Sequence, residues 1–343
     1  MMRTVTLSCS IILGCMLSAC DNSAKIPKGQ SDTSAVENAS TKPLVIPYNE
    51  FPSAMIWQLA LEKGWIKESG VNVKFEYFAD YVAGIEAFLA KKLDADIVTN
   101  GDNFMLSSGG TNGIIILAVD YSAGTDVIVA KPEINSLQDL KGKTVAFEKG
   151  LVSNLLFNTA VEDHKLSTKD FKVLNASTTQ LPQVFTSPDV SAVVLWQPMA
   201  NQALKAVAGS KVIYSSKDKP GLIYDTLSVD AQSLRTRRED WKKLILVWDK
   251  AVNYLNDPNT RDDAIAIMAK KAGIPVKEYA GMVDGVHILT LAENKKLMQK
   301  NNDLSSLYGS SYNVNEFNLK NGIYSKSVDV DGSIYPDLVN ELP

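Results

Sequence analysis

The amino-acid sequence predicts an α/β protein built from two lobes. Short apolar stretches alternate with amphipathic stretches of helical period, and this alternation runs through two cycles. A mostly helical segment follows from Asp230 onward. Such alternation is typical of parallel sheets covered by helices on both faces, so we expect one such sheet in each lobe. With 343 residues, the chain is long enough for two lobes of ordinary domain size.

The first residues predict a secretion signal. Arg3 precedes an apolar run over 5–19, and the small pair Ser18-Ala19 stands directly before Cys20. The run is too short and too broken to span a membrane as a helix. We expect residues 1–19 to be a lipoprotein signal peptide and Cys20 to be lipidated, which would anchor the chain to a membrane. An ordinary secretory signal followed by an incidental cysteine is the alternative.

Residues 20–42 predict a disordered tether between this anchor and the folded body. They are rich in Ser, Asn, Lys and Thr, so they have little apolar surface to bury. Asp21 resembles the inner-membrane retention signal of Gram-negative lipoproteins. We therefore expect the body at the periplasmic face of the inner membrane, or at the outer face of the cell membrane in a Gram-positive cell.

The first cycle begins with an apolar strand over 43–46. A helix is expected over Ser53–Lys63, with Ser53 as its N-cap and Gly64 as its stop. The cycle continues with strands over 71–78, 95–99, 113–119 and 127–130, and with helices over 81–92 and 102–108.

The second cycle and the return to the first lobe follow. The expected strands are 143–147, 171–175, 192–195, 211–214 and 223–229, and the expected helices are 136–141, 150–163, 180–185, 197–207, 241–255, 260–272 and 276–282. Two crossings are expected near Asp126–Lys131 and Gly221–Val229. The first lobe would then comprise 43–128 and 226–343, and the second lobe 129–225.

Composition excludes several classes of function. The formal net charge is −4 and few arginines are present, so no nucleic-acid surface is expected. The only cysteines are Cys9, Cys15 and Cys20, which leaves the body without a disulfide or a cysteine metal site. We expect no cofactor and no metal.

Several segments resemble a known family. Trp57-Gln58-Leu59-Ala60-Leu61-Glu62-Lys63-Gly64-Trp65, Ser136-Leu137-Gln138-Asp139-Leu140-Lys141-Gly142-Lys143 and Ala192-Val193-Val194-Leu195-Trp196-Gln197-Pro198 are similar to stretches of the nitrate/taurine/sulfonate solute-binding proteins of ABC importers. The stretches Asp120–Asp126 and Pro220–Asp225 are similar to proteins that accompany urea and guanidine utilisation. The resemblance covers essentially the whole body.

This resemblance implies a type II periplasmic binding protein. Its two lobes would close on a small solute, and an ABC permease with its ATPase would receive the closed form. The implied partners are the solute, the permease and, through the lipid anchor, the membrane. We expect a monomer that binds no nucleic acid.

Ligands of open α/β sheets bind beyond the carboxyl ends of the strands, so we sought candidate residues there. Carboxylates recur in these loops, no arginine occurs in them, and Lys149 is their only lysine. Paired carboxylates and aromatic faces suit guanidinium or an amine, and Asp and Asn acceptors suit a urea-like solute. The expected ligand-binding residues are Tyr48, Asn49, Phe51, Asp102, Asp120, Asp126, Glu148, Trp196 and Asp225.

Other interpretations stay open at this point. Nitrate, taurine or an aliphatic sulfonate could bind to helix N-termini, and a thiamine-pyrimidine precursor is a further candidate ligand. Asp102 could be an N-cap, Asp120 and Asp126 could shape the turn at Gly124, and Asp225 could cap a hinge. A similar fold is found in a pyrimidine synthase, but the sequence has no histidine at a strand end of the first lobe. We therefore expect no enzyme activity.

Overall fold

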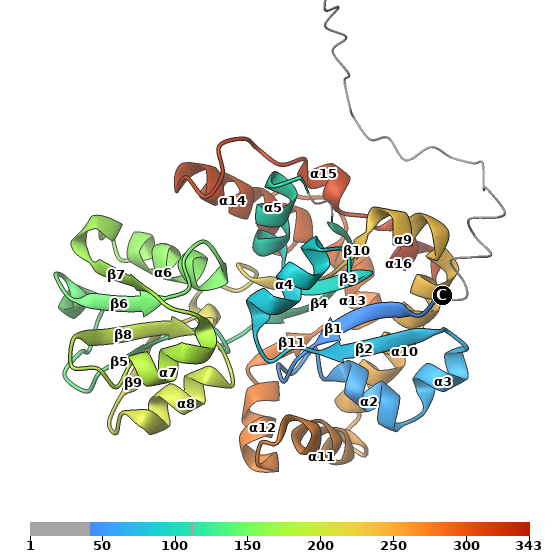
Figure 1. Ribbon diagram of the computed structural model, residues 1–343, viewed down its shortest axis with the longest axis horizontal. Helices are drawn as coiled ribbons and strands as arrows, with labels where there is room; N and C mark the ends of the chain where they lie inside the picture. Colours follow the sequence, from blue (N-terminus) through green and yellow to red (C-terminus); the bar gives the residue numbers. More distant parts are fainter. Residues whose placement is uncertain (1–41, 111–112) are drawn as a thin grey trace, which may run out of the picture.

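The computed structural model describes residues 42–110 and 113–343. The expected signal peptide, Cys20 and the tether up to residue 41 lie outside these residues. The described chain folds into two α/β lobes that stand side by side (Figure 1). Within the described ranges, no helix combines the length and the apolar character needed to cross a membrane.

The first lobe contains two sheets. In one, β1 (Leu44–Tyr48) pairs in parallel with β2 (Val73–Tyr77). The other has the order β11-β4-β10-β3 and contains β3 (Ala95–Thr99), β4 (Gly113–Ser122), β10 (Tyr224–Asp230) and β11 (Val286–Ile288). The helices of this lobe are α2 (Ile56–Glu62), α3 (Trp65–Ser69), α4 (Tyr81–Leu89), α5 (Asn100–Ser108), α9 (Ala231–Thr236), α10 (Arg238–Asn256), α11 (Arg261–Ala272), α12 (Val276–Val283), α13 (Leu291–Leu297), α14 (Leu307–Lys320), α15 (Val330–Ser333) and α16 (Asp337–Glu341).

The second lobe has a single five-stranded sheet in the order β7-β6-β8-β5-β9. Its strands are β5 (Val127–Ala130), β6 (Thr144–Phe147), β7 (Lys172–Asn175), β8 (Val190–Leu195) and β9 (Lys211–Ser215), and its α-helices are α6 (Val152–Asp163), α7 (Leu181–Val184) and α8 (Met199–Ala206). Val129 and Val193, which are neighbours in this sheet, are fully buried.

The expectation of parallel sheets was wrong for every pair of the four-stranded sheet, in which β11 also runs antiparallel to β4, and for the pairs that β5 makes in the second lobe. β10 runs antiparallel to β3 and β4, and β5 runs antiparallel to β8 and β9. The reason is where each strand begins. β3, β4, β8 and β9 end at the junction between the lobes, whereas β5 and β10 start there. β11, in the helical part of the chain, was also not expected.

Two short segments, 123–126 and 216–223, connect the lobes. They are tied together by Ser216, whose hydroxyl accepts the Gly124 N–H at 2.8 Å and lies 2.7 Å from the hydroxyl of Ser122. β5 begins at Val127 and β10 at Tyr224. Residues 127–128 thus join the second sheet and 224–225 the first, which moves both expected boundaries by two residues.

Buried tryptophans fix the loop that follows β1. Trp57 on α2 is fully buried, stacks on Phe75 of β2 and contacts Trp248 of α10. The indole N–H of Trp248 donates to the Leu289 carbonyl at 3.0 Å. Ser53 is not the N-cap of α2, which begins at Ile56 without a side-chain cap. Ser53 is instead fully buried near the lobe junction.

Candidate ligand cleft

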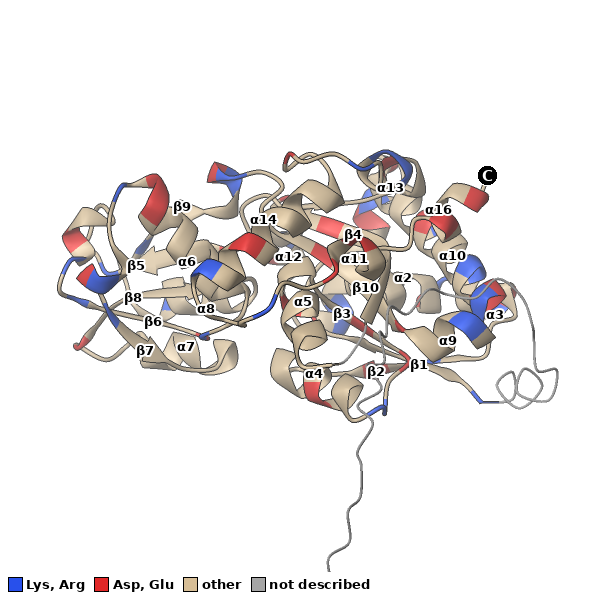
Figure 2. Cartoon of the chain, turned by 90° about the horizontal axis from the view of Figure 1, so that it is seen from above, with Lys and Arg blue, Asp and Glu red and all other residues tan. Residues whose placement is uncertain are grey.

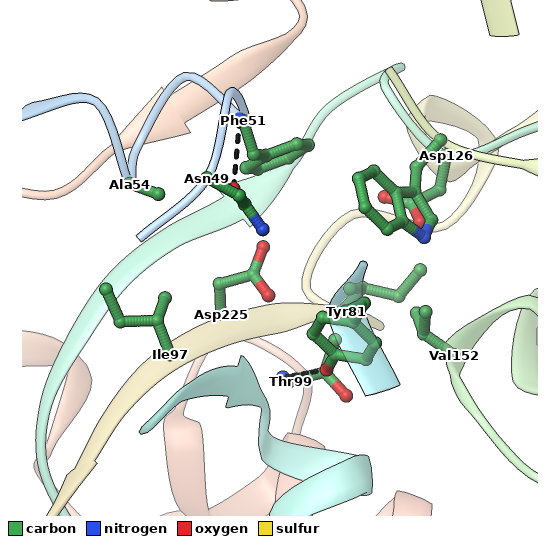
Figure 3. A pocket seen from close by; sticks show the side chains of 11 residues that line it. Asn49, Phe51, Ala54, Tyr81, Ile97, Thr99, Asp126, Val152 and Asp225 are labelled. Carbon is green, nitrogen blue, oxygen red and sulfur yellow. Dashed lines mark hydrogen bonds between the residues drawn. The ribbon is translucent and has the colours of Figure 1, made fainter. Parts of the chain in front are cut away.

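A cavity lies where the two lobes meet. It comprises about 430 Å³ of space between the side chains, part of which is open solvent. β3, β10, α4 and the loop after β1 form one side, and residues of the second lobe and of the two crossings form the other. The lining residues are Asn49, Phe51, Ala54, Tyr81, Ile97, Thr99, Asp126, Val152, Trp196, Ile223 and Asp225 (Figure 3).

Three aromatic side chains bring the lobes together at this cavity. Trp196, which follows β8, packs edge-to-face on Phe51 with ring centroids 5.9 Å apart. It packs in the same way on Tyr81 of α4, at 6.0 Å. Aromatic faces of this kind attract cations, and an aromatic ligand could also stack on them. Two of the expected site residues, Phe51 and Trp196, therefore lie on opposite lobes and in contact.

Tyr81 also belongs to a buried hydrogen-bond network. Its hydroxyl donates to the Asp102 carboxylate at 2.8 Å and accepts the Thr99 N–H at 3.2 Å. Burial, together with Asp102 and Asp225, raises the pKa of Tyr81 well above its ordinary value. The phenol is thus a neutral hydrogen-bond donor fixed at the wall of the cavity.

Asp126, at the end of the first crossing, and Asp225, near the start of β10, present carboxylates to the cavity. In Figure 3 the carboxylate of Asp225 points toward the side-chain amide of Asn49, among the labelled residues. The oxygen of that amide accepts the Phe51 N–H at 3.0 Å, so its NH₂ group faces the cavity. Burial raises the pKa of Asp126 to about 6, against the lowering effect of the Ser122 hydroxyl.

Asp120 lies behind Asp225, and not on the cavity wall. The two residues are direct partners in the antiparallel register of β4 and β10, which places their side chains on the same face. Asp120 is fully buried, and neither of its carboxylate oxygens makes a well-formed hydrogen bond within the described residues. Burial and Asp126 raise its pKa, although the hydroxyl of Ser53 and the carboxyl of Asp225 lie close enough to lower it.

The pair therefore resists double ionisation. The pKa of Asp225 is raised well above its ordinary value, first by burial and then by Asp120, Asp126 and Asp102. Two carboxyls that share one buried site cannot both be charged without a cation beside them. A positively charged ligand at this position would supply that cation.

Asp102 connects the two lobes without lining the cavity. Its carboxylate accepts the Tyr81 hydroxyl and lies near the Val152 N–H, the first amide of α6 in the other lobe. Burial raises the pKa of Asp102 to about 7, whereas Tyr81, Thr99 and Val152 lower it. The backbone N–H of Asp102 donates to Thr99, so Thr99 is the N-cap of α5 and the N-cap interpretation of Asp102 was wrong.

The remaining expected residues lie around this centre. Glu148 does not line the cavity, and its carboxylate accepts the Thr178 hydroxyl at 3.0 Å. Tyr48 lines an adjoining cavity, and its hydroxyl donates to Gln58 at 3.4 Å. Binding of ligand by Tyr48, Asn49, Phe51, Asp102, Asp120, Asp126, Glu148, Trp196 and Asp225 stays a prediction.

Sequence reasoning missed six of the lining residues: Ala54, Tyr81, Ile97, Thr99, Val152 and Ile223. Tyr81 is the first residue of α4 and Thr99 is the last of β3, so both lie where elements change. The signal for Tyr81 was the pair Asp80-Tyr81, a helix start directly after a strand end. Ile97 lies inside β3, and no pattern distinguished it from a core residue.

No lysine or arginine of the described chain lines this cavity. Figure 2 shows blue segments on outer elements such as α3, α10 and α13, whereas a red segment lies on β4 in the middle of the molecule. Residues 42–110 and 113–343 contain no group of three His, Cys, Asp or Glu side chains suited to hold a metal ion. The charge of the cavity wall is thus negative, without a basic side chain to balance it.

A family model described as NMT1/THI5 like matches residues 52–260, which is more than half of the chain. The chain belongs to the NMT1/THI5-like family. A relative from Brucella abortus, whose name describes it as a binding protein, is 23% identical over 163 residues, which cover 48% of this chain and 50% of the relative. The chain spans about half the length of the curated relatives it matches.

Solved structures show that this NMT1/THI5-like chain has a periplasmic-binding-protein fold. The periplasmic aliphatic sulphonate-binding protein SsuA from Escherichia coli superposes with a TM-score of 0.70 at 19% identity, covering 86% of this chain and 92% of that one. The periplasmic nitrate-binding protein NrtA from Synechocystis gives 0.69 at 13% identity, covering 88% of both chains. The desulfurization enzyme DSZB gives 0.62 at 13% identity, covering 88% and 98%. Since one fold serves binding proteins and an enzyme, the cleft residues must decide the function.

Proposed function

We propose that the protein is the extracytoplasmic solute-binding component of an ABC importer and captures a small, positively charged, nitrogen-containing solute such as guanidinium. The observation behind the ligand class is a set of three carboxyls: buried Asp126 and half-buried Asp225 at the cavity, and buried Asp120 behind them. No basic side chain is among the described residues that line the cavity. A guanidinium or ammonium group can donate to two carboxylates at once, and the aromatic rings add cation–π attraction.

Capture would proceed by closure of the lobes. Phe51 and Tyr81 on one lobe and Trp196 on the other supply the two sides of the site. The two short crossings, joined at Ser216, give the lobes a compact hinge. A solute that contacts both lobes stabilises the closed form, and the permease would recognise that form. We further propose that lipidated Cys20 holds the protein at the membrane.

An anionic solute is the second candidate, because the superposed structures include sulfonate- and nitrate-binding proteins. An anion would bind best to free amides at a helix N-terminus. Three helices begin at the cavity, where Tyr81, Thr99 and Val152 line it. The side chains of Asp80 and Thr99 cap α4 and α5, and at α6 the Asp102 carboxylate lies near the Val152 N–H. A second negative charge at that position would be repelled, which favours the cationic solute.

Calorimetric titration of the purified mature protein tests the proposal. The panel is guanidinium, urea, taurine, nitrate and an alkylsulfonate at one pH and one ionic strength. We expect binding of guanidinium and no binding of the sulfonate or nitrate. Tight binding of a sulfonate with no response to guanidinium would overturn the proposed ligand class and leave the fold assignment intact.

A further inference from the structure

A second cavity adjoins the first on the side of the first lobe. It comprises about 280 Å³ of space, part of which is open solvent, and is lined by Pro47, Tyr48, Asn49, Ala54, Phe78, Asp80, Tyr81, Gly84, Asp96 and Ile97. Asn49, Ala54, Tyr81 and Ile97 line both cavities, so the two spaces share a wall. The second cavity therefore extends the cleft away from the lobe junction, between the end of β1 and α4.

A buried carboxylate with one unpartnered oxygen marks this second cavity. Asp96 lies within β3 and is 3% exposed. Its Oδ1 accepts the N–H of Ile97 at 2.9 Å, but its Oδ2 has no hydrogen-bond partner among the described residues. A buried carboxylate oxygen in this state is costly, because it has lost water and gained nothing in return.

The other acidic residues nearby contrast with Asp96. Asp94, two residues earlier, accepts the N–H of Val45 through Oδ2, and Asp80 caps α4 by accepting the N–H of Ala83. Both therefore have a structural task. No lysine or arginine is among the residues of the described chain that line the second cavity. The group that would pair with Asp96 is thus not supplied by the wall of the cavity.

We propose that the cleft binds an extended dication, with one cationic group at Asp126 and Asp225 and the other at Asp96. This inference rests on the proposed function and specifies its ligand: an organic molecule with two nitrogen cations joined by a short aliphatic chain. Ala54 and Ile97, which both cavities share, are apolar and suit methylene groups between the two ends.

The electrostatics of Asp96 agree with this assignment. Burial raises its pKa to about 7, and the charge of Asp102 raises it further, whereas the Ile97 N–H lowers it. An ammonium group beside Oδ2 would offset the cost of the buried charge. Gly84 leaves the space beside Asp96 open because it has no side chain. A Cβ at this position would lie 4.0 Å from Asp96 Oδ1 and 3.9 Å from Phe78.

The test compares 4-aminobutylguanidine with butylguanidine, which has the same shape at the first site but lacks the second cation. Calorimetric titration of the wild type should give a dissociation constant at least about tenfold lower for the dication, since a charged hydrogen bond is gained. In Asp96→Asn this preference should fall to about threefold or less, with little change for guanidinium itself. The control is Asp262→Asn, which removes a negative charge on the exposed face of α11 and should keep the full preference.

Gly84→Ala provides a second variant that does not alter charge. Its methyl group would take up space beside Asp96 without a clash and should improve the helix, so the protein should fold. It should weaken 4-aminobutylguanidine several-fold and leave guanidinium unchanged. The dication assignment would be overturned by equal affinity of the two probes for the wild type, or by an undiminished preference for 4-aminobutylguanidine in both variants. Neither result would contradict the proposed function. Failure of guanidinium and both probes to bind would refute the proposed function itself.

Discussion

Asp120 and Asp225 oppose each other across β4 and β10, where two like charges normally destabilise a sheet. This arrangement is stable only if one of the two negative charges is neutralised. At low pH a bound proton neutralises it, and we infer that a bound cation replaces this proton at higher pH. The same reasoning applies to Asp96, which lines the second cavity and has one buried carboxylate oxygen without a partner among the described residues.

Asp120→Asn should stabilise the ligand-free protein at high pH. The raised pKa of Asp120 means that the folded state holds a proton that the unfolded state has already lost. The stability that comes from this bound proton is fully present below about pH 4, which is the pKa of an Asp in the unfolded chain. It is lost as the pH rises toward about 7, the pKa of Asp120 in the folded protein. The variant has no charge to bury, so its free energy of unfolding should exceed that of the wild type by about 1–3 kcal/mol at pH 8.

Urea unfolding at pH 4 and pH 8 measures this difference, which should nearly vanish at pH 4. Asp262→Asn is the control, since that residue is exposed and should show no such pH-dependent gain. A variant less stable than the wild type at pH 8 would show that the Asp120 charge is stabilising in the apo protein, contrary to our account.

Trp196 is the residue through which the second lobe touches the aromatic wall of the first. We expect Trp196→Ala to weaken guanidinium binding about tenfold, because a cation–π contact of about 1–2 kcal/mol is lost. Trp196→Phe keeps a ring and should retain most of the affinity. Calorimetric titration checks both, and equal losses in the two variants would show that the ring face makes no contribution.

Ser216, in the second crossing segment, joins the two segments by a hydrogen bond to Gly124 in the first. Its hydroxyl accepts the Gly124 N–H and lies within hydrogen-bond distance of Ser122. Ser216→Ala leaves these groups without that partner, so we expect a loss of about 1–2 kcal/mol in the free energy of unfolding. Denaturant titration measures it, with Ser108→Ala on the surface of α5 as the control. An unchanged free energy of unfolding would mean that water replaces the hydroxyl and that the hinge does not depend on it.

Local sequence patterns predicted most strands and helices, since alternation and helical period are properties of short segments. They could not predict the antiparallel direction of β5 and β10, because direction depends on where a strand begins relative to the lobe junction. The same distinction between local patterns and tertiary arrangement applies to the candidate site. Phe51 and Trp196 line the cavity and were expected there because they follow strand ends, whereas Asp96 was not expected because it lies inside β3.

At the scale of the whole molecule, solute binding, proton release and lobe closure should occur together. Burial raises the pKa of Asp126 to about 6 and that of Asp102 to about 7, and the pKa of Asp225 is also raised. A cation between the lobes favours the charged carboxylates, so it must displace their protons. The affinity for guanidinium should therefore increase as the pH rises from about 5 to about 8.

Two measurements test this coupling. Titration calorimetry in buffers of different ionisation enthalpy should reveal net proton release on binding at pH 6, and Asp126→Asn should reduce it. Small-angle scattering should show a smaller radius of gyration with guanidinium than without it, because the ligand stabilises the closed arrangement in which Trp196 contacts Phe51 and Tyr81. Proton uptake on binding, with affinity that falls as the pH rises, is the signature of an anionic ligand. That result would mean that the carboxyls serve the cleft in their protonated form, as hydrogen-bond donors to an anion.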